Sequence, residues 1–178
     1  MNMLLTIVLI ILALIITFLL IAAFTKKGYN IEREVTINKP VAQVFDYVRY
    51  LKNQDNFNKW AMQDPNMKKS FRGTDGAVGS VYAWDGNQRA GKGEQEIMNI
   101  SENKKLDIEV RFERPFKAVS QSPFTTDAIS SNQTKVKWGI SSAMKFPMNA
   151  MLVIMNLEKM LARDMDESLA RLKTNLES

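Results

Sequence analysis

The chain of 178 residues contains no histidine and no cysteine. A Ser-His-Asp triad, a thiol nucleophile and a zinc site built from His or Cys are therefore excluded. Carboxylates and tyrosines are left for acid–base chemistry. Along one predicted strand, Lys92, Glu94 and Glu96 share a face, which Met98 and Ile100 continue. These residues form no recognisable catalytic constellation, and we expect no metal and no cofactor.

Two carboxylates on one strand face would transfer protons to and from a ligand only if burial raised the pKa of one of them. Glu94 and Glu96 have the required spacing, and Tyr82 and Asp85 are further candidates near them. Exposed carboxylates are the commoner case on strands. The sequence thus leaves enzymatic activity open and favours binding over catalysis.

The elements that position these residues begin with a strand. Apolar and polar residues alternate over Ile31–Ile37, as in a half-buried strand. Asn38-Lys39-Pro40 then provides a polar cap and a proline in the first helical turn. A short amphipathic helix is predicted next, from apolar residues at Val41, Val44, Phe45 and Val48. We expect a second short helix or a structured loop from Tyr50 to Trp60.

Six strand-like runs follow, separated by turn signals at a spacing of about ten residues, which is typical of an antiparallel meander. The runs are Met67–Arg72, Val78–Asp85, Ala90–Met98, Lys105–Phe112, Ala118–Ile129 and Thr134–Ser142. Two of them show one apolar and one polar face, with Ile108, Val110 and Phe112 on one apolar face and Val136, Trp138 and Ile140 on the other. One side of the predicted sheet therefore faces solvent.

Helical periodicity begins after Pro147 and continues to the end of the chain. We interpret it as one long terminal helix. Its first half, AMLVIM at 150–155, is apolar nearly all round, whereas the second half carries many charges. The first half is accordingly expected to be the more completely buried.

A charge-free apolar run spans Met3–Phe24 at the other end of the chain. About 22 residues at about 1.5 Å each give about 33 Å, enough to cross a hydrocarbon core of about 30 Å. A cleaved signal peptide would need a basic first segment, a shorter apolar core and a small-residue cleavage site. We therefore predict a transmembrane anchor at 1–25, a juxtamembrane linker at 26–29 and a single soluble domain at 30–178.

Lys26 and Lys27 follow the apolar run, and no Lys or Arg precedes it. The positive-inside rule therefore predicts a single-pass membrane protein with its soluble domain in the cytoplasm. The formal charge of +5 lies entirely after the anchor and favours anionic headgroups. Nucleic acid is not an expected partner, because Lys68-Lys69 and Lys104-Lys105 are short pairs without interleaved aromatic residues.

The order of elements resembles the START-like, or Bet v 1-like, helix-grip superfamily (SRPBCC), in particular its bacterial polyketide cyclase/dehydrase and lipid transport group. The resemblance is carried by three segments and covers nearly the whole soluble part, while the anchor lies outside it. They are Glu34–Pro40 with Val44-Phe45, Gly79–Asn87 with Gly91-Lys92-Gly93, and Leu169–Lys173. The resemblance implies an α+β fold in which a seven-stranded, curved antiparallel sheet wraps around the long C-terminal helix, with two short helices after strand one.

Members of this superfamily keep an apolar cavity between the sheet and the long helix, which implies binding or shuttling of a lipid, an isoprenoid quinone or a similar apolar molecule. The candidate lining residues are Trp60, Tyr82, Trp84, Met98, Phe112, Phe124, Trp138, Met151 and Met155. Core packing alone is the alternative role for each of them. Gln54–Asn66 and Arg114–Lys117 are the predicted lips of the cavity.

Two other functions stay open at this stage. One is a cyclase- or dehydratase-like enzyme that uses Glu94, Glu96, Asp85 or Tyr82 in the same cavity. The other is a protein-interaction module whose cavity is simply packed. The sequence names no protein partner for such a module.

Overall fold

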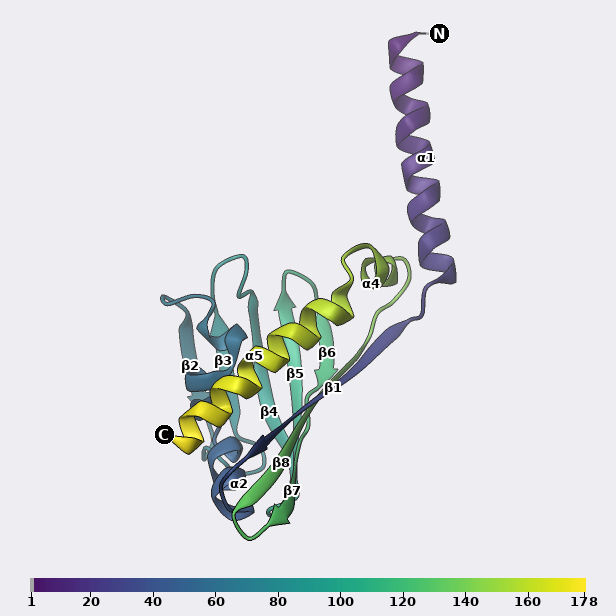
Figure 1. Ribbon diagram of the computed structural model, residues 1–178. Helices are drawn as coiled ribbons and strands as arrows, with labels where there is room; N and C mark the ends of the chain where they lie inside the picture. Colours follow the sequence, from purple (N-terminus) through teal and green to yellow (C-terminus); the bar gives the residue numbers. More distant parts are fainter. Residues whose placement is uncertain (1) are drawn as a thin grey trace.

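The computed structural model describes residues 2–178, in which a long N-terminal helix is joined to an α+β domain (Figure 1). The helix, α1, spans Met3–Phe24 and projects away from the domain, with most of its side chains exposed. It is the one helix of the described residues that is long and apolar enough to cross a membrane. The sheet begins four residues later at Gly28, so that half of the predicted linker 26–29 belongs to the first strand.

The domain is built on one antiparallel sheet with the strand order β1-β8-β6-β5-β4-β3-β2. The strands are β1 Gly28–Ile37, β2 Lys68–Arg72, β3 Val81–Asp85, β4 Lys92–Ser101, β5 Lys105–Arg114, β6 Ala118–Gln121, β7 Phe124–Ser130 and β8 Gln133–Ala143. Both β6 and β7 pair with β5 on one side and β8 on the other. They therefore lie end to end in one position of the sheet, which is seven positions wide.

The single strand predicted over Ala118–Ile129 is thus wrong in one respect, because it is interrupted at Pro123. Proline has no backbone N–H for a strand ladder. The neighbouring groups find other partners, since Gly139 N donates to Pro123 O at 2.9 Å and Ser122 N donates to Ile108 O at 2.7 Å. The interruption bends the strand, and the predicted number of sheet positions is retained.

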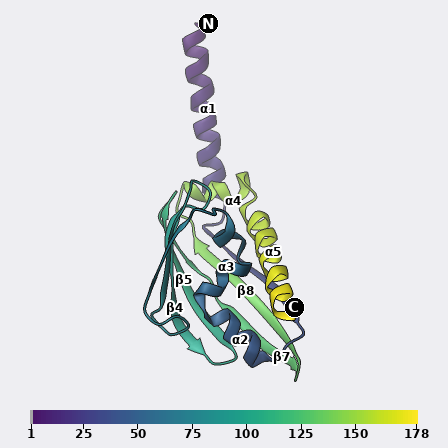
Figure 2. The same ribbon diagram turned by 90° about the vertical axis from the view of Figure 1, so that its left-hand side faces the viewer.

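Short helical segments follow β1 and lie on one side of the sheet together with the C-terminal helix (Figure 2). They are α2 Val41–Arg49, the 3₁₀ turn η1 Leu51–Asn53, α3 Gln54–Phe57 and the 3₁₀ turn η2 Lys59–Met62. The predicted apolar stripe of α2 is confirmed, since Val44, Phe45 and Val48 are fully buried. On the terminal helix, α5 Leu157–Glu177, the corresponding core residues are Met165, Leu169 and Leu172.

The C-terminal helix is not continuous as predicted. The segment consists of the 3₁₀ turn η3 Met148–Ala150, the short helix α4 Met151–Ile154 and α5 Leu157–Glu177. Asn156 separates α4 from α5 in a left-handed conformation with φ of 47°. The expected burial of the first half is also wrong, because Val153, Ile154 and Met155 are all more than half exposed. The reason is that the preceding turn, η3, contacts α1 and holds this segment at the end of the domain from which α1 leaves, rather than under the sheet.

The antiparallel pairing brings several strand ends to the side of the domain from which α1 leaves. The pairs that define this anchor-proximal end are Gly28 with Ala143, Ser120 with Ser142, Lys92 with Arg114, and Asp85 with both Lys92 and Lys68. The β3–β4 and β5–β6 connections also lie here, together with η3 and α4. A pocket that opens at this end of the sheet would therefore face α1.

Candidate functional site

A cavity of about 240 Å³ lies between the concave side of the sheet, η2 and the first turns of α5. Its wall is largely aromatic and aliphatic, with contributions from Trp60, Val110, Phe112, Ile140 and Leu161. Ligand pockets in proteins commonly measure about 300 to 1,000 Å³. The space is therefore suited to a small molecule, or to one ring or chain of a larger one.

Five of the nine predicted lining residues lie in this wall: Trp60, Tyr82, Trp84, Phe112 and Trp138. They form two edge-to-face pairs. The rings of Trp60 and Trp138 lie 5.5 Å apart, and those of Trp84 and Phe112 lie 5.9 Å apart. Their role as ligand contacts stays a prediction.

The other four predicted residues lie elsewhere. Phe124 is buried and stacks on Trp138 with a ring separation of 5.0 Å, so that it supports the wall without lining it. Met98 is 47% exposed, because a bulge between Ile97 and Asn99 interrupts the alternation of β4. Met151 and Met155 belong to the α4 segment, outside the cavity.

The polar groups of the wall were missed by a search for apolar residues. Ser120 and Ser122 flank the lining, and Ser122 Oγ accepts a hydrogen bond of 2.8 Å from Trp138 Nε1. The buried Ser120 Oγ has no hydrogen-bond partner within residues 2–178. Gln95 also reaches the cavity, from the inward face of β4. Ser120 and Gln95 are thus two side chains placed to meet a polar atom of a ligand, and Gln54, Asn58 and Gln63 are further polar residues of the wall.

Tyr82 is the member of the predicted acid–base set that lines the cavity. Its hydroxyl donates to Asp55 Oδ1 at 2.9 Å, and Asp55 forms an ion pair of 2.8 Å with Lys69. Burial raises the pKa of the Tyr82 phenol, and the nearby Asp55 carboxylate raises it further. The phenol therefore stays protonated and acts as a fixed hydrogen-bond donor.

The predicted carboxylates face away from the cavity. On the outer side of β4, Glu94 and Glu96 bind Arg111 of β5 at 2.9 Å and 2.5 Å. Partial burial alone would raise the pKa of Glu94, but hydrogen bonds from Arg111 and Arg72 outweigh it and leave that pKa lowered. Asp85 pairs with Arg114 at the surface. None of the described residues that line the cavity is Asp or Glu, so that Tyr82 is the one member of the predicted acid–base set in its wall.

Gly93 makes room for one of the aromatic walls. It faces inward on β4, opposite Phe112 on β5 and Trp84 on β3. A Cβ added here would lie 2.5 Å from the Arg111 carbonyl oxygen and 2.8 Å from the ring of Trp84. The absence of a side chain therefore lets the indole of Trp84 lie directly against the strand.

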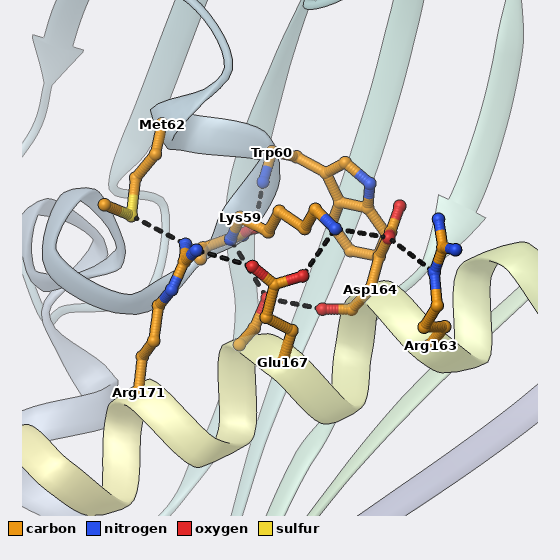
Figure 3. Close-up of polar contacts among 9 residues, drawn as sticks. Lys59, Trp60, Met62, Arg163, Asp164, Glu167 and Arg171 are labelled. Carbon is orange, nitrogen blue, oxygen red and sulfur yellow. Dashed lines mark hydrogen bonds and ion pairs between the residues drawn. The ribbon is translucent and has the colours of Figure 1, made fainter.

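A cluster of charged residues fastens η2, with Trp60, to α5 (Figure 3). Lys59 Nζ lies 2.5 Å from Glu167 Oε2 and 2.9 Å from Asp164 Oδ1. The backbone N–H of Lys59 donates to Ser168 Oγ at 3.0 Å, and Arg171 binds Glu167 at 2.6 Å. Hydrogen bonding to Glu167 raises the pKa of Lys59, and the same contact lowers the pKa of Glu167. This Lys59 cluster holds one predicted lip in place.

The cavity opens at the anchor-proximal end of the domain. Arg89, Arg114 and Pro115 line it and are also exposed to solvent. Arg89 belongs to the β3–β4 connection, Arg114 ends β5 and Pro115 begins the β5–β6 connection. Tyr29, near the start of β1, lines the cavity from the same end. Arg89, Arg114 and Pro115 together are called the cavity opening below. It faces the side from which α1 leaves the domain (Figure 1).

A curved antiparallel sheet that grips a long C-terminal helix around an apolar cavity defines the helix-grip, or Bet v 1-like, class of proteins. The model of the family described as polyketide cyclase/dehydrase and lipid transport matches residues 29–177. The chain therefore belongs to this family, and α1 precedes the matched region. No curated protein sequence matches the chain.

Solved structures with the same fold share little sequence with the chain. Norcoclaurine synthase from Thalictrum flavum, in complex with dopamine and hydroxybenzaldehyde, superposes with a TM-score of 0.62 at 9% identity, covering 89% of this chain and 93% of that one. Ara h 8.0201 gives 0.56 at 14% identity, with 84% and 97% covered. The Aha1 dimer from Colwellia psychrerythraea gives 0.58 at 16% identity, with 84% and 96% covered. At these identities the likeness concerns the fold alone.

Proposed function

We propose that this protein binds or shuttles an apolar small molecule, such as a lipid or an isoprenoid quinone, while α1 anchors it in a membrane. The observation that carries the proposal is an aromatic-lined cavity without a carboxylate, which opens toward the anchor. Lys26 and Lys27, just after α1, favour a cytoplasmic domain. The tether keeps the opening near ligand dissolved in the bilayer, at a high effective concentration.

The size of the cavity limits the ligand. About 240 Å³ does not accept a whole two-chain lipid, whereas a quinone ring or a single acyl chain is a suitable occupant. Burial of about 300 Å² of apolar ligand surface would contribute about 7 kcal/mol before the costs of association. The expected affinity is thus micromolar or weaker, as suits a carrier that must release its ligand.

The test is native mass spectrometry and lipid extraction on the full chain, purified in detergent from its native membrane. Val110→Trp fills the cavity, because Val110 lies in its wall. Val119→Trp is the matched control, because Val119 lies on the adjacent strand and is 52% exposed. We expect an apolar ligand on the wild type and on the control, and its loss from the filled variant. Equal ligand on all three proteins, or none on the wild type, would refute the proposal.

A further inference from the structure

We propose that residues 146–155, called the α4 segment, are a second membrane contact, in which Phe146, Val153, Ile154 and Met155 insert into the leaflet where α1 ends. This inference rests on the proposed insertion of α1 in a bilayer, and it adds how the domain is oriented on that bilayer. The four residues are called the α4 patch. Lipid is the molecule that would cover this patch.

The α4 patch is apolar and open to solvent. Its side chains are exposed by 63% at Val153, 53% at Ile154 and Phe146, and 51% at Met155. Single exposed apolar residues are ordinary, but a group of neighbours this exposed marks an interaction surface. Leu152, which precedes Val153 in α4, is buried and fastens α4 to the domain.

Hydrogen bonds fix the α4 patch at the level of the last turn of α1. The side-chain amide of Asn149 is buried and donates from Nδ2 to Ala22 O at 2.7 Å and to Thr25 O at 2.9 Å. These carbonyls belong to the helix end, where backbone acceptors have no partner in the helix itself. Met144 N also donates to Lys27 O at 3.0 Å. Both views show α4 beside the domain-side end of α1 (Figures 1 and 2).

This position selects lipid as the occupant. If α1 spans a bilayer, its last turn lies at the boundary between acyl chains and headgroups. The α4 patch flanks the η3 turn, whose Asn149 is bonded to that last turn, and so lies near the same depth. Apolar side chains beside basic residues are the pattern of a segment that lies in this interface. The basic residues here are Lys27, Lys145 and Lys159, all exposed. Glu158, the nearby acid, is paired with Lys26 at 2.6 Å.

Insertion of the α4 patch would press the cavity opening against the leaflet. The β5–β6 connection, which carries Pro115 of the opening, also carries Phe116, exposed by 64%, at the same end of the sheet. Two contacts, α1 and the α4 patch, restrict the tilt that one flexible joint would permit. An apolar ligand would then pass between lipid and cavity with little exposure to water.

The chain has no cysteine, so that single cysteine variants of the full chain carry a fluorophore at one site only. Three variants are labelled with the polarity-sensitive dye NBD: Leu12→Cys within α1, Val153→Cys in the α4 patch and Ile129→Cys on β7. Ile129 is the matched control, because it is an apolar residue exposed by 51% at the far end of the sheet. Each protein is placed as one copy in nanodiscs of phosphatidylcholine and phosphatidylglycerol, with or without spin-labelled lipid.

We expect spin-labelled lipid to quench the dye at positions 12 and 153 and not at 129, with emission at 153 blue-shifted relative to 129. Quenching at 12 combined with water-like emission at 153 overturns the inference and leaves the anchor intact. Absence of quenching at 12 removes the anchoring on which both proposals rest. The dye at position 153 could instead show blue-shifted emission that spin-labelled lipid does not quench and that appears only with several copies per disc. That result would identify a contact between copies, and it would also overturn the inference. Ligand loading, measured separately, does not enter this test.

Discussion

Replacement of Gly93 by alanine should damage the cavity through one methyl group. The new Cβ would lie 2.5 Å from the Arg111 carbonyl oxygen, a distance that real Cβ atoms essentially never show, and 2.8 Å from the ring of Trp84. The carbonyl belongs to the paired backbone of β5, so that either β4 must move outward or the indole must move into the cavity. Both responses reduce the space for a ligand.

The magnitude follows from overpacking, which costs about 1 to 3 kcal/mol. The lower backbone entropy of alanine in the unfolded chain returns about 0.4 to 1 kcal/mol. The net loss of unfolding free energy is thus about 0 to 2.6 kcal/mol, with a midpoint of about 1.3 kcal/mol, which corresponds to about 3 to 5 °C in Tm for a domain of this size. Displacement of Trp84 should also weaken ligand binding by a larger factor than the loss of stability explains.

Gly139→Ala is the matched control. Gly139 also lies within a strand, but its added Cβ would meet only the side chain of Pro123, at 3.3 Å. Thermal unfolding and ligand titration of both variants form the assay. We expect Gly139→Ala to remain within about 1 kcal/mol of the wild type, with unchanged ligand binding. Wild-type stability and affinity in Gly93→Ala would refute the argument that this glycine makes room for Trp84.

Three further predictions concern η2, the outer sheet face and the core. Lys59→Ala should free η2 from α5, detected as faster amide exchange over residues 59–62, because it removes both carboxylate contacts. The pKa of Glu167 is lowered, so the stability that its ion pair with Lys59 contributes is fully present above the ordinary glutamate pKa and is lost as the pH falls through the lowered pKa. Acid should therefore speed the same amide exchange. The Glu94→Gln and Glu96→Gln variants should bind ligand as the wild type does, measured by titration, because both carboxylates lie outside the cavity. Leu172→Ala should cost about 2 to 5 kcal/mol in denaturant unfolding, because Leu172 is fully buried.

The controls for these three predictions use residues that lack the feature tested. Replacement of the exposed Lys68 on β2 by alanine is the control for Lys59→Ala. Unchanged amide exchange over residues 59–62 in Lys59→Ala would contradict the role given to the Lys59 cluster. Val110→Trp, which fills the cavity, serves as the positive control for the glutamine variants. A loss of affinity in Glu94→Gln would place that carboxylate in contact with the ligand. Exposed Met160 on α5 serves for Leu172, and equal losses at both positions would contradict the assignment of the core.

Features that depend on neighbours along the chain were predicted correctly. The alternation over Val136, Trp138 and Ile140 gave the inward face of β8, and the helical spacing in α2 gave its buried stripe. The order of elements was sufficient for the fold and the family. Five of the nine proposed lining residues lie in the cavity wall. Strand alternation placed Phe112 and Trp138, whereas Tyr82, Trp84 and Trp60 were proposed as aromatic residues of a predicted strand and a predicted lip.

The errors arose where a contact distant in sequence decided the outcome. The bulge at Met98 shifts the face of β4 by one residue, and it depends on pairing with β5. The apolar residues of α4 indicated burial, but an apolar side chain does not specify which apolar surroundings it meets. The buried Asn149, which joins this segment to α1, gave no signal in the sequence because asparagine is an ordinary loop residue.

The sequence by itself determined that the chain has an apolar segment of spanning length, a helix-grip order of elements and no His or Cys chemistry, because length, periodicity and composition are local properties. The tertiary structure alone decided that a cavity exists, that it measures about 240 Å³, and that its opening and the α4 patch share the end next to α1. A cavity is the volume left between elements once the sheet has curved, and its direction depends on which strand ends meet. Neither quantity is encoded in any single segment, and both follow from how the segments pack.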